Sequence, residues 1–203
     1  MYASASTPTL VSALWPRLGV RRDAVLVLGG SVLTALAAQL SLPLPGIPVP
    51  LTGQTFAVLL VGALLGGRLG FLALTAYLLE GLAGLPVFAL ARGAWSPSAV
   101  PGVPWILGPT AGYLLALPLA AGAVGWLAER GWDRRFLTAA PAMLLGNAII
   151  FSLGMLWLGR FVGLANAVPL GLLPFLPGDA LKLLLAALAL PSGWAVLGRL
   201  GLR

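Results

Sequence analysis

Residues 174–190 read Pro-Phe-Leu-Pro-Gly-Asp-Ala-Leu-Lys-Leu-Leu-Leu-Ala-Ala-Leu-Ala-Leu, with Asp179 and Lys182 at the entrance to a wholly apolar run. A run of this kind is typical of a membrane-spanning helix. Ionisable side chains are costly in hydrocarbon, so a pair at this depth indicates a function. Lys182 is also the only lysine of the chain. The stretch therefore predicts the fold class and a candidate site together.

The composition of the whole chain is that of an integral membrane protein. Of its 203 residues, 60% are hydrophobic and 8% are charged, whereas soluble domains carry about 25% charged residues. No stretch is long and polar enough for a soluble domain, so we expect a single membrane domain, residues 1–203. Its residues 1–23 form a cytoplasmic N-terminal segment, and the polar residues 1–16 predict no signal peptide.

The net charge of +7 does not indicate nucleic-acid binding, because the basic residues lie at the ends of apolar runs. This distribution is an orientation signal of membrane proteins. The chain has no histidine and no cysteine, which removes the commonest metal ligand and the commonest general base. We therefore expect no metal, no cofactor and no enzymatic activity.

Six apolar stretches are long enough to span a bilayer, and together they predict an all-α membrane protein with six transmembrane helices in one bundle. They cover 24–42, 51–67, 69–88, 108–128, 137–159 and 172–198. Six spans place both termini on one side. That side collects Arg17, Arg21, Arg22, Arg68, Arg130, Arg134, Arg135, Arg199 and Arg203, against Arg92 and Arg160 on the other. Nine against two predicts that both termini are cytoplasmic.

The orientation also gives each polar side chain a depth, because a helix rises about 1.5 Å per residue through a core about 30 Å thick. Counted from the cytoplasmic arginines, the polar side chains lie about 18–30 Å deep, in the outer half. They are Gln39, Gln54, Glu80, Tyr113, Asn147, Asp179 and Lys182. The asymmetry predicts a polar pocket that opens to the outside, as in a capture site, and argues against a continuous channel.

Structural roles for the same residues stay open at this point. Glutamine, asparagine and tyrosine also hydrogen-bond between membrane helices. Asp179 can cap a helix and Lys182 can extend to the interface, or the two can pair, since residues three apart share a helix face. Glu80 can be an ion-pair partner of Arg92.

Four motifs carry a family resemblance: Pro-Val-Pro-Leu-Thr-Gly-Gln-Thr at 48–55, Gly-Leu-Pro-Val-Phe-Ala at 84–89, Gly-Pro-Thr-Ala-Gly-Tyr at 108–113 and the stretch 174–182. In this order among six spans, they resemble the BioY family. That family comprises the biotin-binding S components of energy-coupling-factor (ECF) transporters. The resemblance covers roughly residues 30–190 and implies a protein of the prokaryotic plasma membrane that takes up biotin.

The resemblance also implies a binding site that matches the chemistry of biotin. Lys182, with Arg92, is expected to bind the carboxylate. Asp179 is expected to accept the ureido N–H groups, assisted by Thr110, Tyr113 or Asn147. Phe88 and the tryptophans are expected to form apolar walls. Gln54 and Glu80 complete the set of expected substrate-binding residues.

Transport against a gradient requires a partner, because the chain contains no Gly-x-x-x-x-Gly-Lys-Ser/Thr phosphate loop. The resemblance implies a membrane coupling protein with two ATPase subunits. Small residues at four-residue spacing, Ser31 with Ala35 and Thr34 with Ala38, allow close helix approach. They form either the docking face for the coupling protein or a packing face within the bundle.

Two other functions are compatible with the sequence. The chain can be an S component for another small carboxylate-bearing vitamin. Less favoured is an intramembrane enzyme, which would need a Ser–Lys pair in which Ser152 approaches Lys182 from a neighbouring helix.

Overall fold

The computed structural model describes residues 8–15 and 19–201 and is predominantly helical. Its helices are α1 (Leu10–Leu14), α2 (Val20–Gln39), α3 (Gln54–Leu65), α4 (Gly67–Leu82), α5 (Ala111–Ala128), α6 (Phe136–Val162), α7 (Leu164–Gly171) and α8 (Leu176–Arg199). Short 3₁₀ turns are η1 (Ala89–Ala91), η2 (Trp105–Leu107) and η3 (Trp132–Arg134). Arg17 and Arg203 lie outside the described residues.

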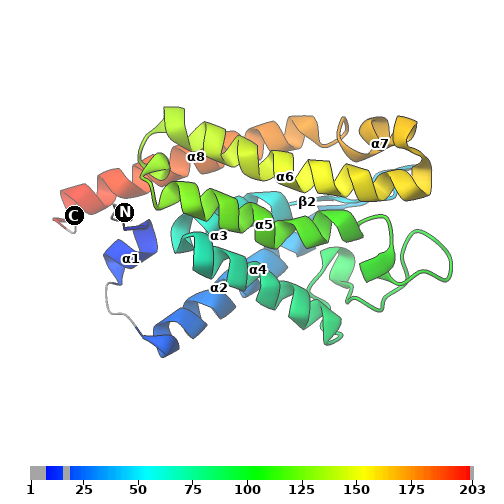
Figure 1. Ribbon diagram of the computed structural model, residues 1–203, viewed down its shortest axis with the longest axis horizontal. Coiled ribbons are helices and arrows are strands. Elements are labelled where there is room, and N and C mark those ends of the chain that lie inside the picture. Colours follow the sequence, from blue (N-terminus) through cyan, green and yellow to red (C-terminus); the bar gives the residue numbers. More distant parts are fainter. Residues whose placement is uncertain (1–7, 16–18, 202–203) are drawn as a thin grey trace, which may run out of the picture.

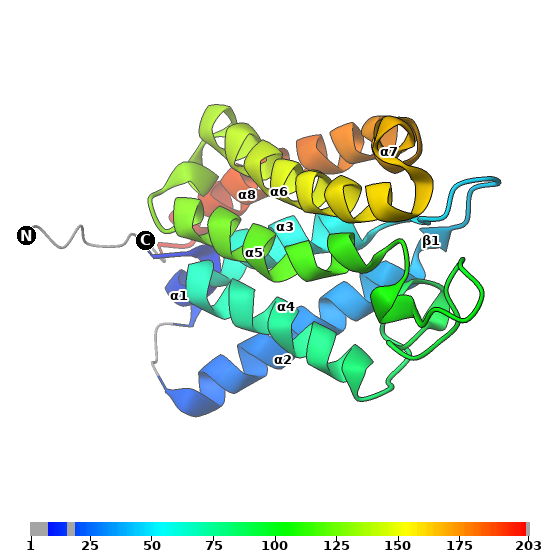
Figure 2. The same cartoon turned by 45° about the vertical axis from the view of Figure 1, so that its right-hand side comes forward.

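The long helices form an elongated bundle with α3 and α5 at its centre. Helix α5 packs against α3, α4 and α6, while α2 packs against α3 and α4, and α8 against α3 and α6. Figures 1 and 2 accordingly show α2 and α4 on one side of α5, and α6 and α8 on the other. Helix α1 and the end of α8 lie at one end of the bundle, and α7 lies at the opposite end.

Each of the six predicted apolar stretches overlaps one of the helices α2 to α6 or α8. Among the described residues, three helices are long and apolar enough to cross a membrane: α5, α6 and α8. Helix α3 has 12 residues, a length of about 18 Å, because the predicted stretch begins with strand β2 and the helix starts only at Gln54. Helix α4 ends at Leu82 instead of residue 88, because the chain turns at Gly84, where φ is +94°.

Glycines let α3, α4 and α5 approach closely at the centre. A Cβ on Gly62 of α3 would lie 2.5 Å from the carbonyl oxygen of Ala121 in α5, and one on Gly70 of α4 would lie 2.9 Å from Gly62 Cα. Small residues at such crossings bring helix backbones together and increase van der Waals contact. This packing sets the spacing of the three helices.

Several short elements lie outside the predicted helices. Strands β1 (Ser41–Leu42) and β2 (Leu51–Thr52) pair antiparallel, with Ser41 opposite Thr52. Helix α1, within the expected N-terminal segment, buries Leu10 in a cluster that includes Leu59 and Trp194. Helix α7 has eight residues. The β1–β2 pair and α7 stand at the end of the bundle where α8 begins (Figure 1).

Candidate binding site

A cavity opens between α3, α5, α6 and α8, with an empty volume of about 600 Å³ that includes its mouth. Its wall is mostly apolar and is formed by Val49, Pro50, Ala89, Trp105, Leu114, Leu117, Ile150, Phe151 and Phe175. The polar side chains that line it are Thr52, Gln54, Thr55, Thr110, Tyr113, Asp179 and Lys182. An apolar chamber with a few placed polar groups is typical of a small-molecule site.

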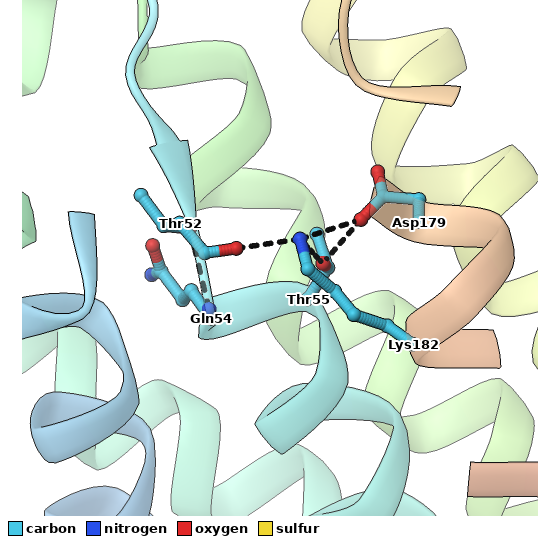
Figure 3. Close-up of polar contacts among 5 residues, drawn as sticks. All are labelled: Thr52, Gln54, Thr55, Asp179 and Lys182. Atoms are coloured by element: carbon cyan, nitrogen blue, oxygen red, sulfur yellow. Dashed lines mark hydrogen bonds and ion pairs between the residues drawn. The ribbon is translucent and has the colours of Figure 1, made fainter. Parts of the chain in front are cut away.

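Asp179 and Lys182 pair with each other at the cavity wall (Figure 3). Lys182 Nζ lies 2.8 Å from Asp179 Oδ1, 2.6 Å from the Thr52 carbonyl oxygen and 3.3 Å from Thr55 Oγ1. Thr55 in turn donates its hydroxyl to Asp179 Oδ1 at 2.8 Å. These four residues form the polar cluster of the cavity.

The local structure explains why these residues meet. Asp179 lies in the first turn of α8, where the helix dipole favours a carboxylate, and Lys182 follows one turn later on the same face. Thr52 ends β2, and its hydroxyl accepts the backbone N–H of Gln54 at the start of α3 at 3.2 Å. The hairpin thereby holds the Thr52 carbonyl beside the first turn of α8.

The hydrogen bonds of Asp179 and Lys182 determine which of their polar atoms remain available to a ligand. An ammonium has three N–H donors, and those of Lys182 have three acceptors within 3.3 Å. Asp179 is 4% exposed and uses Oδ1 for both of its side-chain hydrogen bonds. Its Oδ2 has no hydrogen bond to any described residue, and in Figure 3 it points away from Lys182. The cluster therefore offers a carboxylate oxygen more readily than a cation.

Helix α5 and its N-cap residue present one stripe of side chains to the cavity, namely Thr110, Tyr113, Leu114 and Leu117. Tyr113 donates its hydroxyl to the Gly171 carbonyl at 2.8 Å, which ties α5 to the end of α7. Thr110 Oγ1 is buried without a hydrogen-bond partner among the described residues. A buried hydroxyl without a partner is costly, so Thr110 is a candidate to bind a ligand.

Four of the expected substrate-binding residues do not line the cavity. Phe88 is wholly buried in the core, with its ring edge-on to Tyr77 at 5.4 Å. Glu80 accepts the hydroxyl of Ser31 at 2.5 Å and forms no ion pair with Arg92. Both side chains are used within the bundle and do not line the cavity.

Arg92 and Asn147 also lie outside the cavity wall. The Arg92 guanidinium donates to the Pro97 carbonyl and stacks 4.8 Å from the centre of the Trp105 ring. It thus supports the wall residue Trp105 from outside the cavity. Asn147 lies one helical turn before Ile150, which lines the cavity, and its Oδ1 is buried without a partner among the described residues.

The expected docking face on α2 packs inside the bundle. Ser31, Thr34 and Ala38 are wholly buried, and Ala35 packs against the core cluster of α4 and α5. Of the two alternatives that the sequence left open, the structure therefore has intramolecular packing. The outer face of α2 carries larger side chains instead, among them Val25, Leu28, Val32 and Leu36.

Sequence reasoning missed Thr52 and Thr55, although both belong to the motif at 48–55. A threonine in an apolar helix usually bonds its own backbone, so its type alone does not predict an ion-pair contact. The backbone at 90–91 was not anticipated either. Leu90 and Ala91 have φ of +60° and +53°, and their N–H groups donate to Ser41 Oγ and Gln39 Oε1. This turn places Ala89 at the cavity.

Comparison with known proteins gives consistent matches. The sequence profile of the BioY family matches residues 8–199. The "Probable biotin transporter BioY" of Pyrococcus horikoshii is 42% identical over 74% of this chain and 82% of its own length. The "Biotin transporter BioY" of Thermotoga maritima is 38% identical over 78% and 87%.

One solved structure also has the same fold. It is the crystal structure at 2.1 Å of the S-component for biotin from an ECF-type ABC transporter. It superimposes with a TM-score of 0.72 over 87% of this chain and 94% of its own, at 22% sequence identity.

Proposed function

Because the chain belongs to the BioY family, we propose that it is the substrate-capture subunit of a vitamin uptake transporter and that its substrate is biotin. The observation that carries this proposal is the polar cluster of Asp179, Lys182, Thr52 and Thr55 on the wall of an otherwise apolar cavity. Ionisable side chains in a membrane helix are energetically costly, so such a cluster indicates a function, here the binding of a substrate.

The chemistry of the cavity supports biotin as the ligand. Biotin has a carboxylate tail, a ureido ring with two N–H donors and a carbonyl acceptor, and an apolar thiophane ring. The free Oδ2 of Asp179 can accept a ureido N–H, and Thr110 Oγ1 can bond to the same ring. Trp105, Phe151 and Phe175 supply apolar surface for the thiophane. Each hydrogen bond to a charged group contributes about 1.5–3 kcal/mol.

Lys182 is proposed to bind the carboxylate by exchanging one of its present partners. Its contact with Thr55 Oγ1, at 3.3 Å, is the longest of the three. Giving up this contact would leave the pair with Asp179 intact, so that neither buried charge loses its counter-ion. Thr55 could keep its own hydrogen bond to Asp179.

We further propose that α2 to α6 and α8 cross the prokaryotic plasma membrane, with both termini in the cytoplasm. Seven of the nine arginines assigned to that side are described, namely Arg21, Arg22, Arg68, Arg130, Arg134, Arg135 and Arg199. They lie at the starts of α2 and α4, between α5 and α6, and at the end of α8, which share one end of the bundle (Figure 1). This clustering supports the orientation, and the cavity then faces outward.

Delivery of biotin inward is proposed to need a membrane coupling protein and ATPase subunits of an ECF module, since the chain has no phosphate loop. The matched crystal structure comes from an ECF-type ABC transporter, which supports such an assembly. Burial of the side chains of Ser31, Thr34 and Ala38 argues against them as the docking face for the coupling protein.

Equilibrium binding of biotin to the purified protein in detergent tests the proposal. Tight, saturable binding at one site is expected, and its absence from a folded preparation would refute it. A competition panel of other carboxylate-bearing vitamins separates biotin from the alternative vitamins, because an excess of these should leave bound biotin in place.

An intramembrane enzyme is not supported. Ser152 is exposed on α6 and does not line the cavity. The side-chain hydroxyl at Lys182 belongs to Thr55, which donates to Asp179. The relatives named above are transporters.

A further inference from the structure

Gln54 lines the cavity, but its side-chain amide is held from behind by a residue that does not. Gln54 Nε2 lies 3.0 Å from Tyr77 Oη, and Tyr77 Oη lies 3.1 Å from the carbonyl oxygen of Val87. Tyr77 itself is wholly buried, edge-on to Phe88. The three groups form a chain of hydrogen bonds from the Val87 backbone to the cavity wall.

The donor and acceptor groups of this series of hydrogen bonds determine the direction of each bond. A backbone carbonyl can only accept a hydrogen bond, so the single hydroxyl proton of Tyr77 must be donated to Val87. The oxygen of Tyr77 can then only accept from Gln54, which must supply its NH₂ group. The opposite amide orientation would place two acceptors 3.0 Å apart. Gln54 Oε1 is therefore the end left for other contacts, and it has no hydrogen bond to any described residue.

The Val87 carbonyl, at the far end of this series of hydrogen bonds, is also bound by Gln39. Gln39 donates to the carbonyl oxygens of Val87 and Phe88 at 3.4 and 3.2 Å, and its Oε1 accepts the N–H of Ala91 at 3.0 Å. The Val87 carbonyl oxygen thus accepts from both Gln39 and Tyr77, which helps to hold the direction of Tyr77 and of the Gln54 amide.

We infer that Tyr77 is a positioning residue that fixes Gln54 as a hydrogen-bond acceptor on the cavity wall. The wall then favours a ligand that presents an N–H group to Gln54 and repels one that presents a second acceptor there. An unanchored glutamine would offer either end and could not make this distinction. The inference rests on the proposed function, with a ureido N–H of biotin as the group recognised.

A double-mutant cycle with Tyr77→Phe and Gln54→Ala tests the inference by equilibrium binding of biotin. Tyr77→Phe removes only the hydroxyl and should weaken binding about three- to tenfold, the range for one neutral hydrogen bond. Gln54→Ala should weaken binding about tenfold. In the Gln54→Ala background, Tyr77→Phe should have no further effect, because Tyr77 acts through Gln54.

Ser31→Ala is the matched control for loss of a buried hydroxyl. Ser31 of α2 donates to Glu80 of α4 at 2.5 Å, away from the cavity. Its variant should be destabilised comparably in a thermal unfolding assay and should bind biotin as the wild type does. A Tyr77→Phe variant with wild-type affinity, or with equal loss in both backgrounds, would overturn the inference.

Gln54→Glu tests the polarity without altering Tyr77. The comparison is made at acidic pH, because a protonated glutamic acid can donate to Tyr77 and still present a carbonyl oxygen, whereas an ionised one would set an acceptor against the Tyr77 oxygen. Biotin binding should stay within about threefold of wild type, whereas Gln54→Ala loses more. If Gln54→Glu, in its protonated form, binds as poorly as Gln54→Ala, Gln54 is not an acceptor. Failure of the wild type to bind biotin would instead refute the proposed function.

Discussion

At the scale of single residues, the Asp179–Lys182 ion pair lines the candidate site and is also largely shielded from solvent. Asp179 is 4% exposed and the Lys182 side chain 19%, so each charge depends on the other. Replacing one partner of a buried pair leaves an uncompensated charge, which costs about 3 kcal/mol or more, whereas replacing both with apolar residues is often neutral. Binding and folding can therefore be separated by mutation.

We predict that Lys182→Met lowers the thermal stability in detergent and weakens biotin binding at least about tenfold, the value of one charged hydrogen bond. The double variant Asp179→Leu/Lys182→Met should regain most of the stability and none of the binding. Ser192→Ala, which removes an exposed hydroxyl on the same helix, is the control. Wild-type affinity in either Lys182 variant would contradict the role proposed for this residue.

Asp133, in the turn between α5 and α6, is a buried carboxyl group whose effect on stability should depend on pH. It is 1% exposed, and its Oδ2 accepts the indole N–H of Trp194 at 2.6 Å. Burial raises the pKa of Asp133 above its ordinary value of 3.8, although the hydrogen bond from Trp194 and the charge of Arg134 act in the opposite direction.

The raised pKa means that the folded protein binds this proton more tightly than the unfolded chain does. The stabilisation is therefore complete below the ordinary pKa and is lost as the pH rises through the raised value. Asp133→Asn should remove this contribution. We expect the difference in melting temperature between Asp133→Asn and wild type to grow in favour of the variant as the pH rises, and a constant difference would contradict this.

At the scale of elements, the close crossing of α3, α4 and α5 depends on glycines, which have no side chain. We predict that Gly62→Ala destabilises the protein by about 1–3 kcal/mol, as overpacking does, because its Cβ would lie 2.5 Å from the Ala121 carbonyl oxygen. Gly29→Ala is the matched control, since a Cβ there meets nothing within 4 Å. It should stabilise α2 by up to about 1 kcal/mol.

Thermal or denaturant unfolding in detergent measures both glycine variants. Equal effects of the two substitutions would show that helix propensity, and not the close crossing, decides their stability. The same comparison explains why the crossing was not predicted. A glycine in an apolar stretch looks the same in sequence whether it faces a neighbouring backbone or open space.

At the scale of the whole molecule, the orientation of the bundle can be tested directly, because the chain has no cysteine. Ala99→Cys introduces a thiol in the exposed loop before η2, and Gly201→Cys introduces one after α8. On intact cells, a membrane-impermeant maleimide should label Ala99→Cys and not Gly201→Cys. After the cells are opened, both should react. Labelling of Gly201→Cys on intact cells would reverse the proposed orientation.

How far the sequence alone could lead is clearest at α2. The sequence shows which residues α2 contains. Only the structure shows that Ser31 and Thr34 are buried while Val32 and Leu36 are exposed. In a membrane protein, however, both the lipid-facing and the protein-facing sides are apolar, so hydrophobic periodicity does not distinguish them. The direction of the small-residue face therefore could not be read from its spacing.

The sequence by itself determined that this is an all-α membrane protein and that it resembles the BioY family. It also showed that Asp179 and Lys182 are ionisable residues beside a membrane-spanning apolar run. Those conclusions follow from composition, local order and the cost of charge in lipid, which are properties of short stretches. Only the tertiary structure decided that Lys182 contacts Thr52 and Thr55, that Tyr77 stands behind Gln54, and that Phe88, Glu80 and Arg92 lie outside the cavity. These are contacts between helices far apart in the chain, and their geometry depends on how the bundle packs.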